Sequence, residues 1–205
     1  NALISGGTSG IGLALAQGFA AAGYNVIAAG LGPLPHSTPS IRFARLDVTD
    51  GPAVAALVSE LPELDVVVNA AGIIRREDEF DPDIFAQVID INLNGTMRIC
   101  TAARAALAKR NGSIINIASV SAHLPLSRVV AYSSAKAAVL NLTQFLAREW
   151  APSGVRVNSI TPGFFPAEQN LRLLFNPDGT TTPRAAAILG HTPMARFGDA
   201  DELSG

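Results

Sequence analysis

Residues 1–22 read NALISGGTSGIGLALAQGFAAA, an apolar run that passes through a glycine-rich turn into an alanine-rich pattern. The apolar run 1–5 predicts a β-strand, and the stretch 11–22 predicts an α-helix. Glycines between them permit a tight bend and a close approach of the backbone to a pyrophosphate. The start of the helix offers free N–H groups and a positive dipole end to the same phosphates. This strand–turn–helix order is the setting that a dinucleotide-binding turn requires.

The alternation of strand and helix continues along the rest of the chain. Further strands are predicted at 25–29, 41–46, 65–69, 112–118 and 155–161, and further helices at 53–60, 82–92, 96–109 and 132–150. Continuously apolar strands such as Val66-Val67-Val68 are typical of a parallel sheet that is covered on both faces. The pattern predicts an α/β fold, a doubly wound parallel sheet with helices on both faces, in a single domain spanning 1–205.

Two segments interrupt this alternation. Leu31–Ser40 carries three prolines and a glycine where a helix would be expected, so we predict a loop there. The segment 162–196 is long and proline-rich, and such an insertion in a compact domain is often a functional lid; we predict that it covers a substrate. Residues 199–203 resemble the start of a helix, and we expect that a C-terminal strand is missing from this sequence.

The composition excludes several classes of protein. Hydrophobic residues make up 48% of the 205 residues and charged residues only 16%, which indicates a globular chain. The formal net charge of −2 argues against nucleic acid or an anionic membrane as a partner. No apolar run approaches the roughly 18 residues of a membrane span. The single cysteine, Cys100, excludes an internal disulfide and a cysteine-rich metal site, and it fits a reducing, cytoplasmic setting.

Candidate cofactor-binding residues occur where the predicted strands end, because open α/β sheets bind ligands at that edge. In the first turn they are Gly6, Thr8, Ser9, Gly10, Ile11 and Gly12. At the end of the third strand, Asp47-Val48 offers a carboxylate to an adenine amino group, with helix capping before Pro52 as the alternative. At the end of the fourth, Asn69, Ala70, Ala71 and Gly72 offer small residues against which a cofactor could lie, while Asn69 could equally tie neighbouring loops together.

The end of the second strand usually distinguishes NAD from NADP, because a carboxylate there binds the ribose hydroxyls of NAD. This chain has Gly30-Leu31 at that point, with neither an acidic nor a basic residue directly after it. Arg42 and Arg45 are the nearest cations along the chain. The sequence therefore leaves NAD or NADP open, with a slight preference for NAD.

Tyr132 and Lys136 are four residues apart in a predicted helix, so they lie on one face of it. A fixed ammonium beside a phenol favours the phenolate, and we expect it to lower the pKa of Tyr132 from about 10. Ser119, directly after an apolar strand, could hold a carbonyl oxygen, and Ser121 is the rival hydroxyl. Together with the phosphate-binding turn, these residues indicate a redox enzyme.

At this point the chain resembles the short-chain dehydrogenase/reductase family, of the compact single-domain type. The matching residues, in order and at the expected spacing, are Gly6-x-x-x-Gly10-x-Gly12, Asn69-Ala-Ala-Gly72, Asn92, Ser119, Tyr132-x-x-x-Lys136 and Pro162-Gly163. The resemblance covers essentially the whole chain, apart from the loop 31–40 and the missing acidic or basic selector.

The resemblance implies a Rossmann-type sheet, a nicotinamide cofactor and a role for each matching residue. Tyr132 would be the proton donor or acceptor, and Ser119 would hold the carbonyl or alcohol oxygen. Lys136 would bind the nicotinamide ribose, and Asn92 would position a water that connects Lys136 to solvent. The family also implies cofactor contacts from Pro162-Gly163 and a homotetramer or homodimer formed through the helices 96–109 and 132–150.

The expected substrate is a small polar carbonyl or alcohol. Candidate polar groups around the pocket are His123, Arg128, Arg75, Arg76, Glu168, Gln169 and His191. The stretch Ile73-Ile74-Arg75-Arg76-Glu77-Asp78 and the pair Glu149-Trp150 resemble the sugar-acid dehydrogenases of the family, of the gluconate and deoxygluconate type. An arginine could pair with a substrate carboxylate. The alternatives are a 3-ketoacyl-thioester reductase and, from another class, a non-catalytic nucleotide-sensing regulator.

Overall fold

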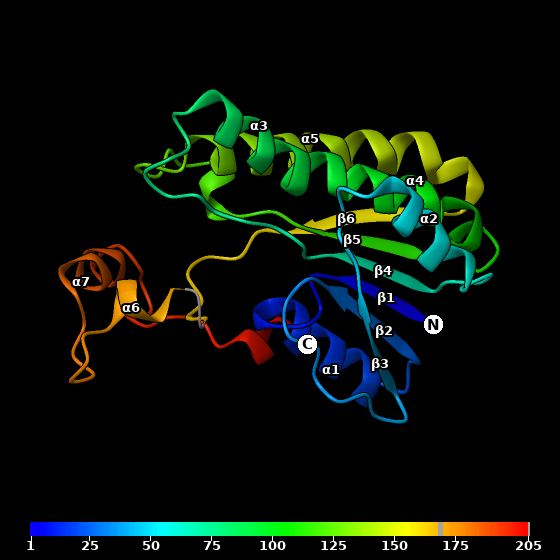
Figure 1. Ribbon diagram of the computed structural model, residues 1–205, viewed down its shortest axis with the longest axis horizontal. Coiled ribbons are helices and arrows are strands. Elements are labelled where there is room, and N and C mark those ends of the chain that lie inside the picture. The colour runs from blue at the N-terminus through cyan, green and yellow to red at the C-terminus, as the bar shows by residue number, and fades with distance from the viewer. Residues whose placement is uncertain (168–169, 205) are drawn as a thin grey trace.

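A six-stranded parallel sheet forms the centre of the computed structural model, which describes residues 1–167 and 170–204 (Figure 1). Its strand order is β3-β2-β1-β4-β5-β6. The strands are β1 (Ala2–Ser5), β2 (Val26–Gly30), β3 (Ile41–Arg45), β4 (Val66–Asn69), β5 (Ser113–Ile117) and β6 (Arg156–Ile160). The order reverses between β1 and β4, and the crevice outside such a reversal is where doubly wound folds bind ligands.

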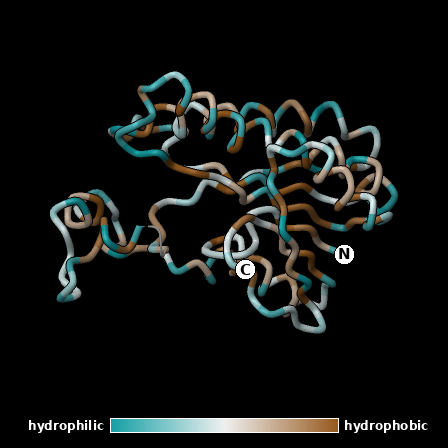
Figure 2. Tube along the Cα trace, in the orientation of Figure 1, coloured by the Kyte–Doolittle hydropathy of each residue, from teal (hydrophilic) through white to brown (hydrophobic). Residues whose placement is uncertain are grey.

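Helices cover both faces of this sheet, as the sequence predicted. In Figure 1 the helix α1 (Gly10–Ala21) lies on one side, and α2 (Gly51–Ser59), α4 (Gly95–Ala108) and α5 (Val130–Trp150) lie on the other. The core has a cluster for each face, one around Leu3, Val67 and Ile114, the other around Ile4, Leu15 and Val68. Alternate residues of β1 and β4 thus point into different clusters, and Figure 2 shows the hydrophobic colour concentrated on the strands.

The two helices predicted at 82–92 and 96–109 are joined in the structure. Helix α3 (Pro82–Ile89) continues through a π-helical turn, η1 (Asp90–Asn94), directly into α4. Gly95 does not break the helix, because its missing side chain lets the helix approach the segment after β3: a Cβ there would lie 2.6 Å from Val48 Cγ2. The π turn puts Asn92, which is fully buried, at the centre of the irregularity. Such turns inside α-helices often occur at functional sites.

The segment 162–196 contains more regular structure than its prolines suggested. It holds two short helices, α6 (Leu171–Leu174) and α7 (Pro183–Gly190), joined by an antiparallel bridge between Phe175 and Thr181. In Figure 1 these helices lie beyond the carboxyl ends of β5 and β6, apart from the sheet. The short helix η4 (Ala200–Leu203), capped by Asp199, follows and packs against α1. The loop predicted at Leu31–Ser40 contains no helix or strand.

Candidate active site

The glycine turn after β1 depends on two very close approaches of the backbone. Gly6 has φ +71°, and a Cβ there would lie 2.5 Å from the Ala71 nitrogen, so the turn packs directly on the chain that leaves β4. A Cβ on Gly12 would lie 2.1 Å from the Gly6 oxygen. The first turn of α1 therefore sits on the strand end with no room for a side chain. Thr8 and Ser9 complete the loop, with Ser9 at the N-cap, and Gly10 and Ile11 are the first residues of α1.

The end of β2 lies against the same turn. A Cβ on Gly30 would lie 2.7 Å from Thr8 Oγ1, while Leu31 is exposed. Gly30 pairs in register with Arg45, the last residue of β3, and Arg45 is also exposed. Paired positions of parallel strands share a face of the sheet. Arg45 therefore lies beside the turn after β2. The residues that directly follow Gly30 in the sequence include no such cation.

Asp47 does not cap helix α2, so the capping alternative was wrong. The cap is Asp50, whose side chain accepts a hydrogen bond from the Ala53 N–H at 3.0 Å. Asp47 Oδ1 instead accepts from the Thr49 N–H and hydroxyl, at 2.9 and 2.7 Å. This local turn orients the carboxylate at the carboxyl end of β3 and leaves Oδ2 available to a ligand. Val48 is buried against Gly95.

The side chain of Asn69 ties neighbouring elements together, which was the second interpretation of this residue. Its Nδ2 donates to Asn116 Oδ1 at 2.9 Å and to Cys100 Sγ at 3.2 Å. Burial raises the pKa of the Cys100 thiol to about 12, so this cysteine is an inert part of the network. Ala70, Ala71 and Gly72 continue towards the cleft.

Ser119, Tyr132 and Lys136 converge beside Gly72. Ser119 is buried at the end of the chain segment that leaves β5, and its Oγ accepts a hydrogen bond from the Ser121 N–H at 3.2 Å. Lys136 is also buried; its Nζ donates to the Ile117 oxygen at 2.7 Å and lies 5.6 Å from the centroid of the Tyr132 ring. Strand β5 and helix α5 thus bring the three polar groups to one edge of the sheet.

The pKa values in this cluster differ from the sequence-based expectation. Burial raises the pKa of Tyr132, and an interaction with the Ser119 hydroxyl opposes this rise. Burial also lowers the pKa of Lys136 to about 8. The expected lowering of the Tyr132 pKa was therefore wrong for this structure, because desolvation dominates the shift and the charge of Glu79 adds to it. The interaction with Tyr132 distinguishes Ser119 from Ser121, whose buried hydroxyl has no partner among the described residues.

Asn92 lies next to this cluster and has one free acceptor. Its Nδ2 donates to the Ile73 and Val88 oxygens, at 3.0 and 2.9 Å. Its buried Oδ1 has no hydrogen-bond partner within residues 1–167 and 170–204, and a Cβ on Gly72 would lie 2.5 Å from it. A buried acceptor without a partner costs free energy, so this atom indicates a place for a donor.

The other predicted residues surround the same edge of the sheet. The Pro162 oxygen accepts from the Val120 N–H at 3.0 Å, and Gly163 follows it in open space. Arg76 donates to the Ser127 oxygen at 2.8 Å, and Arg128 pairs with Glu77 at 2.7 Å. Arg75 and His123 are exposed, and His191 is held by the Ala187 oxygen on α7. Glu168 and Gln169 lie outside the described residues.

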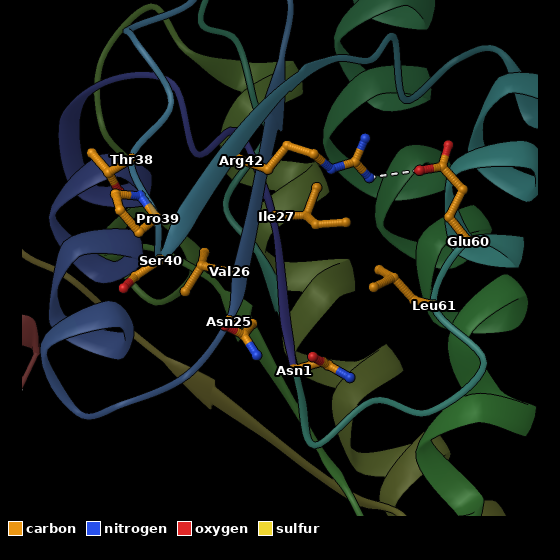
Figure 3. Close-up of a pocket in the computed structure, with 10 residues that line it drawn as sticks. All are labelled: Asn1, Asn25, Val26, Ile27, Thr38, Pro39, Ser40, Arg42, Glu60 and Leu61. Carbon is orange, nitrogen blue, oxygen red and sulfur yellow. Dashed lines mark hydrogen bonds and ion pairs between the residues drawn. The ribbon is translucent and has the colours of Figure 1, made fainter.

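A cavity lies at the opposite edge of the sheet. Figure 3 shows it between the amino ends of β1, β2 and β3, with the ion pair between Arg42 and Glu60 beside it at 2.7 Å. It contains none of the predicted catalytic or cofactor-binding residues. We therefore locate the candidate site from the convergence of polar groups.

Comparison with known proteins agrees with this geometry. The family model described as short chain dehydrogenase matches residues 1–173.

The chain belongs to the short chain dehydrogenase family.

Relatives and solved structures differ in how much of their length they share with this short chain dehydrogenase. An uncharacterized oxidoreductase of Haemophilus influenzae is 50% identical over 99 residues, which cover 48% of this chain and 35% of that protein. The gluconate 5-dehydrogenase of Gluconobacter oxydans is 32% identical over 220 residues, covering 100% of this chain and 84% of the relative. The crystal structure of a gluconate 5-dehydrogenase from Burkholderia cenocepacia, in complex with NADP and tartrate, superposes with a TM-score of 0.86 at 30% identity and covers 100% of this chain and 84% of that one.

The residues of this short chain dehydrogenase fit a nicotinamide dinucleotide. Gly6 and Gly12 leave no room for side chains, Asn92 Oδ1 has no donor in the described part of the chain, and the Lys136 ammonium uses one of its three donors on Ile117. Each observation is independent of the others, and all three occur at the same edge of the sheet. In the described part of the chain, no helix combines the length and the apolar character needed to cross a membrane.

Two residues near the site of this short chain dehydrogenase were not predicted. Glu79 is fully buried and accepts hydrogen bonds from the Arg75 and Tyr132 N–H groups, both at 2.9 Å. Its neighbours Glu77 and Asp78 are also acidic, so nothing in the sequence distinguished the buried carboxylate. Arg184, near the start of α7, lies close enough to Arg76 to perturb its pKa. It follows Pro183 in the segment 162–196, and its proximity to Arg76 could not be derived from spacing along the chain.

Proposed function

We propose that this protein is an NAD(P)-dependent oxidoreductase that interconverts a secondary alcohol and a ketone on a sugar acid or keto-sugar. The observation that carries the proposal is the convergence of Ser119, Tyr132 and Lys136 beside Gly72. The gluconate 5-dehydrogenase names of the Gluconobacter and Burkholderia relatives support the substrate class. We propose that residues 1–205 act as one dinucleotide-binding and catalytic domain, in which 162–196 is the substrate lid.

In the proposed mechanism, the side chains position the substrate and move one proton. The bound cofactor supplies or accepts the hydride. In the direction of alcohol oxidation, the Tyr132 phenolate removes the hydroxyl proton, and Ser119 donates a hydrogen bond to the developing alkoxide. In the opposite direction, the Tyr132 phenol protonates the carbonyl oxygen.

Lys136 has a separate role in this proposal. Its pKa of about 8 keeps the ammonium form dominant at neutral pH, although burial disfavours it. The N–H groups that Ile117 does not use would bind the hydroxyls of the nicotinamide ribose. Asn92 Oδ1, free and next to Gly72, would accept from a water between Lys136 and solvent.

Arg76 and Arg184 together provide a place for a substrate carboxylate. Burial lowers the pKa of Arg76, the nearby charge of Arg184 lowers it further, and Glu77 and Glu79 oppose this. Two guanidinium groups, one from the loop after β4 and one from α7, thus repel each other beside the segment that joins Ser119 to Tyr132. A carboxylate between them would remove this repulsion and could accept bidentate hydrogen bonds.

A substrate panel with a matched variant tests this assignment. The wild type should oxidise D-gluconate and reduce its 5-keto form. Arg184→Gln should raise the KM for D-gluconate about 10–100-fold, because a hydrogen bond to a charged group contributes about 1.5–3 kcal/mol. Its kinetics with a neutral polyol should not change. The control is Arg172→Gln, which alters an exposed arginine on α6 of the same lid.

Three results would count against the proposal. Equal changes in KM for the acid and the polyol would refute a carboxylate contact. Turnover of an acyl thioester or keto ester with none of any sugar acid would favour the 3-ketoacyl-thioester reductase. NAD(P)H binding without turnover of any carbonyl would favour the nucleotide-sensing regulator, although Tyr132 and Lys136 are both present.

The slight preference for NAD gains no support from the comparisons, because the Burkholderia structure contains NADP. We propose that Arg45 enables this protein to bind the 2′-phosphate of NADP. It is exposed, pairs in register with Gly30, and takes part in no ion pair among the described residues. The absence of an acidic residue at Gly30-Leu31 removes the repulsion that would exclude the phosphate.

Arg45→Gln should weaken NADPH binding about 10–100-fold and leave NADH binding unchanged, since only NADPH carries the phosphate. Fluorescence titration of both cofactors measures this. The control is Arg42→Gln on the same strand, whose guanidinium pairs with Glu60 at the other end of β3. An equal loss of affinity for both cofactors, or none for NADPH, would contradict the role of Arg45.

The assembly and location of the protein remain predictions. A homotetramer or homodimer through α4 and α5 is supported by the exposed Met97 and Phe145 on those helices. Sedimentation of the purified protein would test it, and a monomer at all concentrations would contradict it. The proposed cytoplasmic location is supported only by the cofactor and the single, buried cysteine.

A further inference from the structure

Glu79 is a carboxylate with no exposed surface, in the loop 72–81 that follows β4. Its Oε1 accepts from the Arg75 N–H and its Oε2 from the Tyr132 N–H, both at 2.9 Å. Both oxygens act as acceptors. Burying a carboxylate is costly unless its oxygens are hydrogen-bonded, so a residue of this kind needs a reason to be there.

Helix α5 explains what Glu79 does for the backbone. Its N-cap, Val129, has an apolar side chain and makes no capping hydrogen bond. The Tyr132 N–H belongs to the first turn of the helix, where N–H groups have no partner within the helix. Glu79 provides that partner from 53 residues away in the chain, and its negative charge lies at the positive end of the helix dipole.

Further contacts fix the loop 72–81 against the segment before α5. Glu77 and Arg128 have positive φ values of 80° and 64°, which are unusual for residues with side chains. They face each other, with the ion pair at 2.7 Å and a hydrogen bond from the Glu77 N–H to the Arg128 oxygen at 3.3 Å. Strained backbone of this kind persists where the surroundings determine it and is common at active sites.

We propose that Glu79 is a positioning residue for the reaction: it fixes the backbone of Tyr132 and that of Arg75 in one unit, so that the phenol meets a substrate held by the loop. The inference rests on the proposed catalytic role of Tyr132. It differs from simple stabilisation because Glu79 also brings a fixed charge close to the phenol.

That charge has a definite effect on the phenol. Burial is the main reason why the pKa of Tyr132 is raised, the Ser119 interaction opposes it, and the charge of Glu79 raises it further. Lys136 faces the ring from the next turn of α5, and Arg76 is the cation near Glu79 on the loop. Removing the Glu79 charge should therefore lower the pKa of Tyr132 and make the phenolate form at lower pH.

The decisive variant is Glu79→Gln, which has nearly the same shape but turns one acceptor into a donor that faces a backbone N–H. We expect kcat to fall about 10–100-fold, as small misplacements of reacting groups do, with cofactor affinity unchanged. The pH at which kcat for alcohol oxidation rises, as Tyr132 ionises, should move to a lower value; this rise is the pH limb of kcat. Glu79→Asp keeps the charge but has a shorter reach. In that variant kcat should fall, and the pH limb should stay at its wild-type position. The control is Asp78→Asn, the same change at the exposed neighbour.

A second measurement does not depend on any substrate. The sequence contains two tyrosines, so Tyr24→Phe leaves Tyr132 as the only one. The near-ultraviolet absorbance of phenolate then reports its ionisation, which should occur at lower pH in Tyr24→Phe/Glu79→Gln than in Tyr24→Phe. If the ionisation of Tyr132 shifts in this way but the protein turns over no substrate, the effect of Glu79 on Tyr132 stands and the proposed function fails. If neither the absorbance titration nor the kcat limb moves in Glu79→Gln, or if Asp78→Asn moves them equally, the proposal is wrong.

Discussion

Replacing Tyr132 with phenylalanine is expected to reduce turnover by about 10²–10⁴-fold, the usual contribution of a positioned proton donor or acceptor. The change removes only the phenol oxygen. The ring can stay where Lys136 lies 5.6 Å from its centroid, and the glycine turn is not affected. NADPH should therefore bind with nearly unchanged affinity, because the groups that would contact it are all retained.

Initial rates and a fluorescence titration of the same preparation separate these two effects. The matched control is Tyr24→Phe, which removes a phenol oxygen at a ring that packs edge-on against Phe19 with 5.3 Å between centroids. Its turnover should equal that of the wild type. Tyr132→Phe with wild-type turnover would refute the acid–base role, and a parallel loss of NADPH affinity would show that the variant had disturbed the cofactor site.

The alternation of strands and helices was sufficient to predict the sheet. Strands β1, β2 and β4 are buried at every position and are almost entirely apolar, which makes the centre of the sheet easy to recognise in the sequence. The loop at Leu31–Ser40 was predicted for a local reason, its prolines. The join between α3 and α4 was missed because glycine normally weakens a helix, and only the contact of Gly95 with Val48 shows why it is tolerated here. Helices α6 and α7 were missed because prolines were taken as breaks, whereas Pro183 starts α7.

The candidate site was predicted where local spacing determines geometry. Tyr132 and Lys136 share a helix face, and Ser119 follows a strand, so their convergence depends only on the sheet. The pKa of Tyr132 could not be predicted in this way, since burial dominates it and burial is a property of the whole fold. The roles of Glu79, Arg184 and Arg45 could not be predicted either. Each role depends on a contact between residues 15 to 108 positions apart in the chain: Glu79 with Tyr132, Arg184 with Arg76, and Arg45 with Gly30. No sequence motif describes these contacts.

The other large effect is expected at Gly12. In Gly12→Ala the new methyl group would lie 2.1 Å from the Gly6 oxygen and 2.7 Å from the Gly6 carbonyl carbon. Both atoms belong to the backbone, so no side chain can rotate away, and either the turn or the start of α1 must move. Such overpacking costs typically about 1–3 kcal/mol of stability. The melting temperature should fall measurably.

Cofactor binding should suffer more than stability in this variant. The pyrophosphate is expected to bind to N–H groups of the same turn, and each hydrogen bond to a charged group that is lost costs about 1.5–3 kcal/mol, or about 10–100-fold in affinity. NADH and NADPH should lose affinity equally, because both carry the pyrophosphate; Arg45→Gln is expected to affect NADPH alone. The control is Gly51→Ala at the start of α2, where a Cβ would meet nothing within 4 Å. If Gly12→Ala bound both cofactors as the wild type does, the pyrophosphate would have to lie elsewhere. The glycine turn and the pair of Tyr132 and Lys136, at the same edge of the sheet, would then no longer indicate one nicotinamide dinucleotide site.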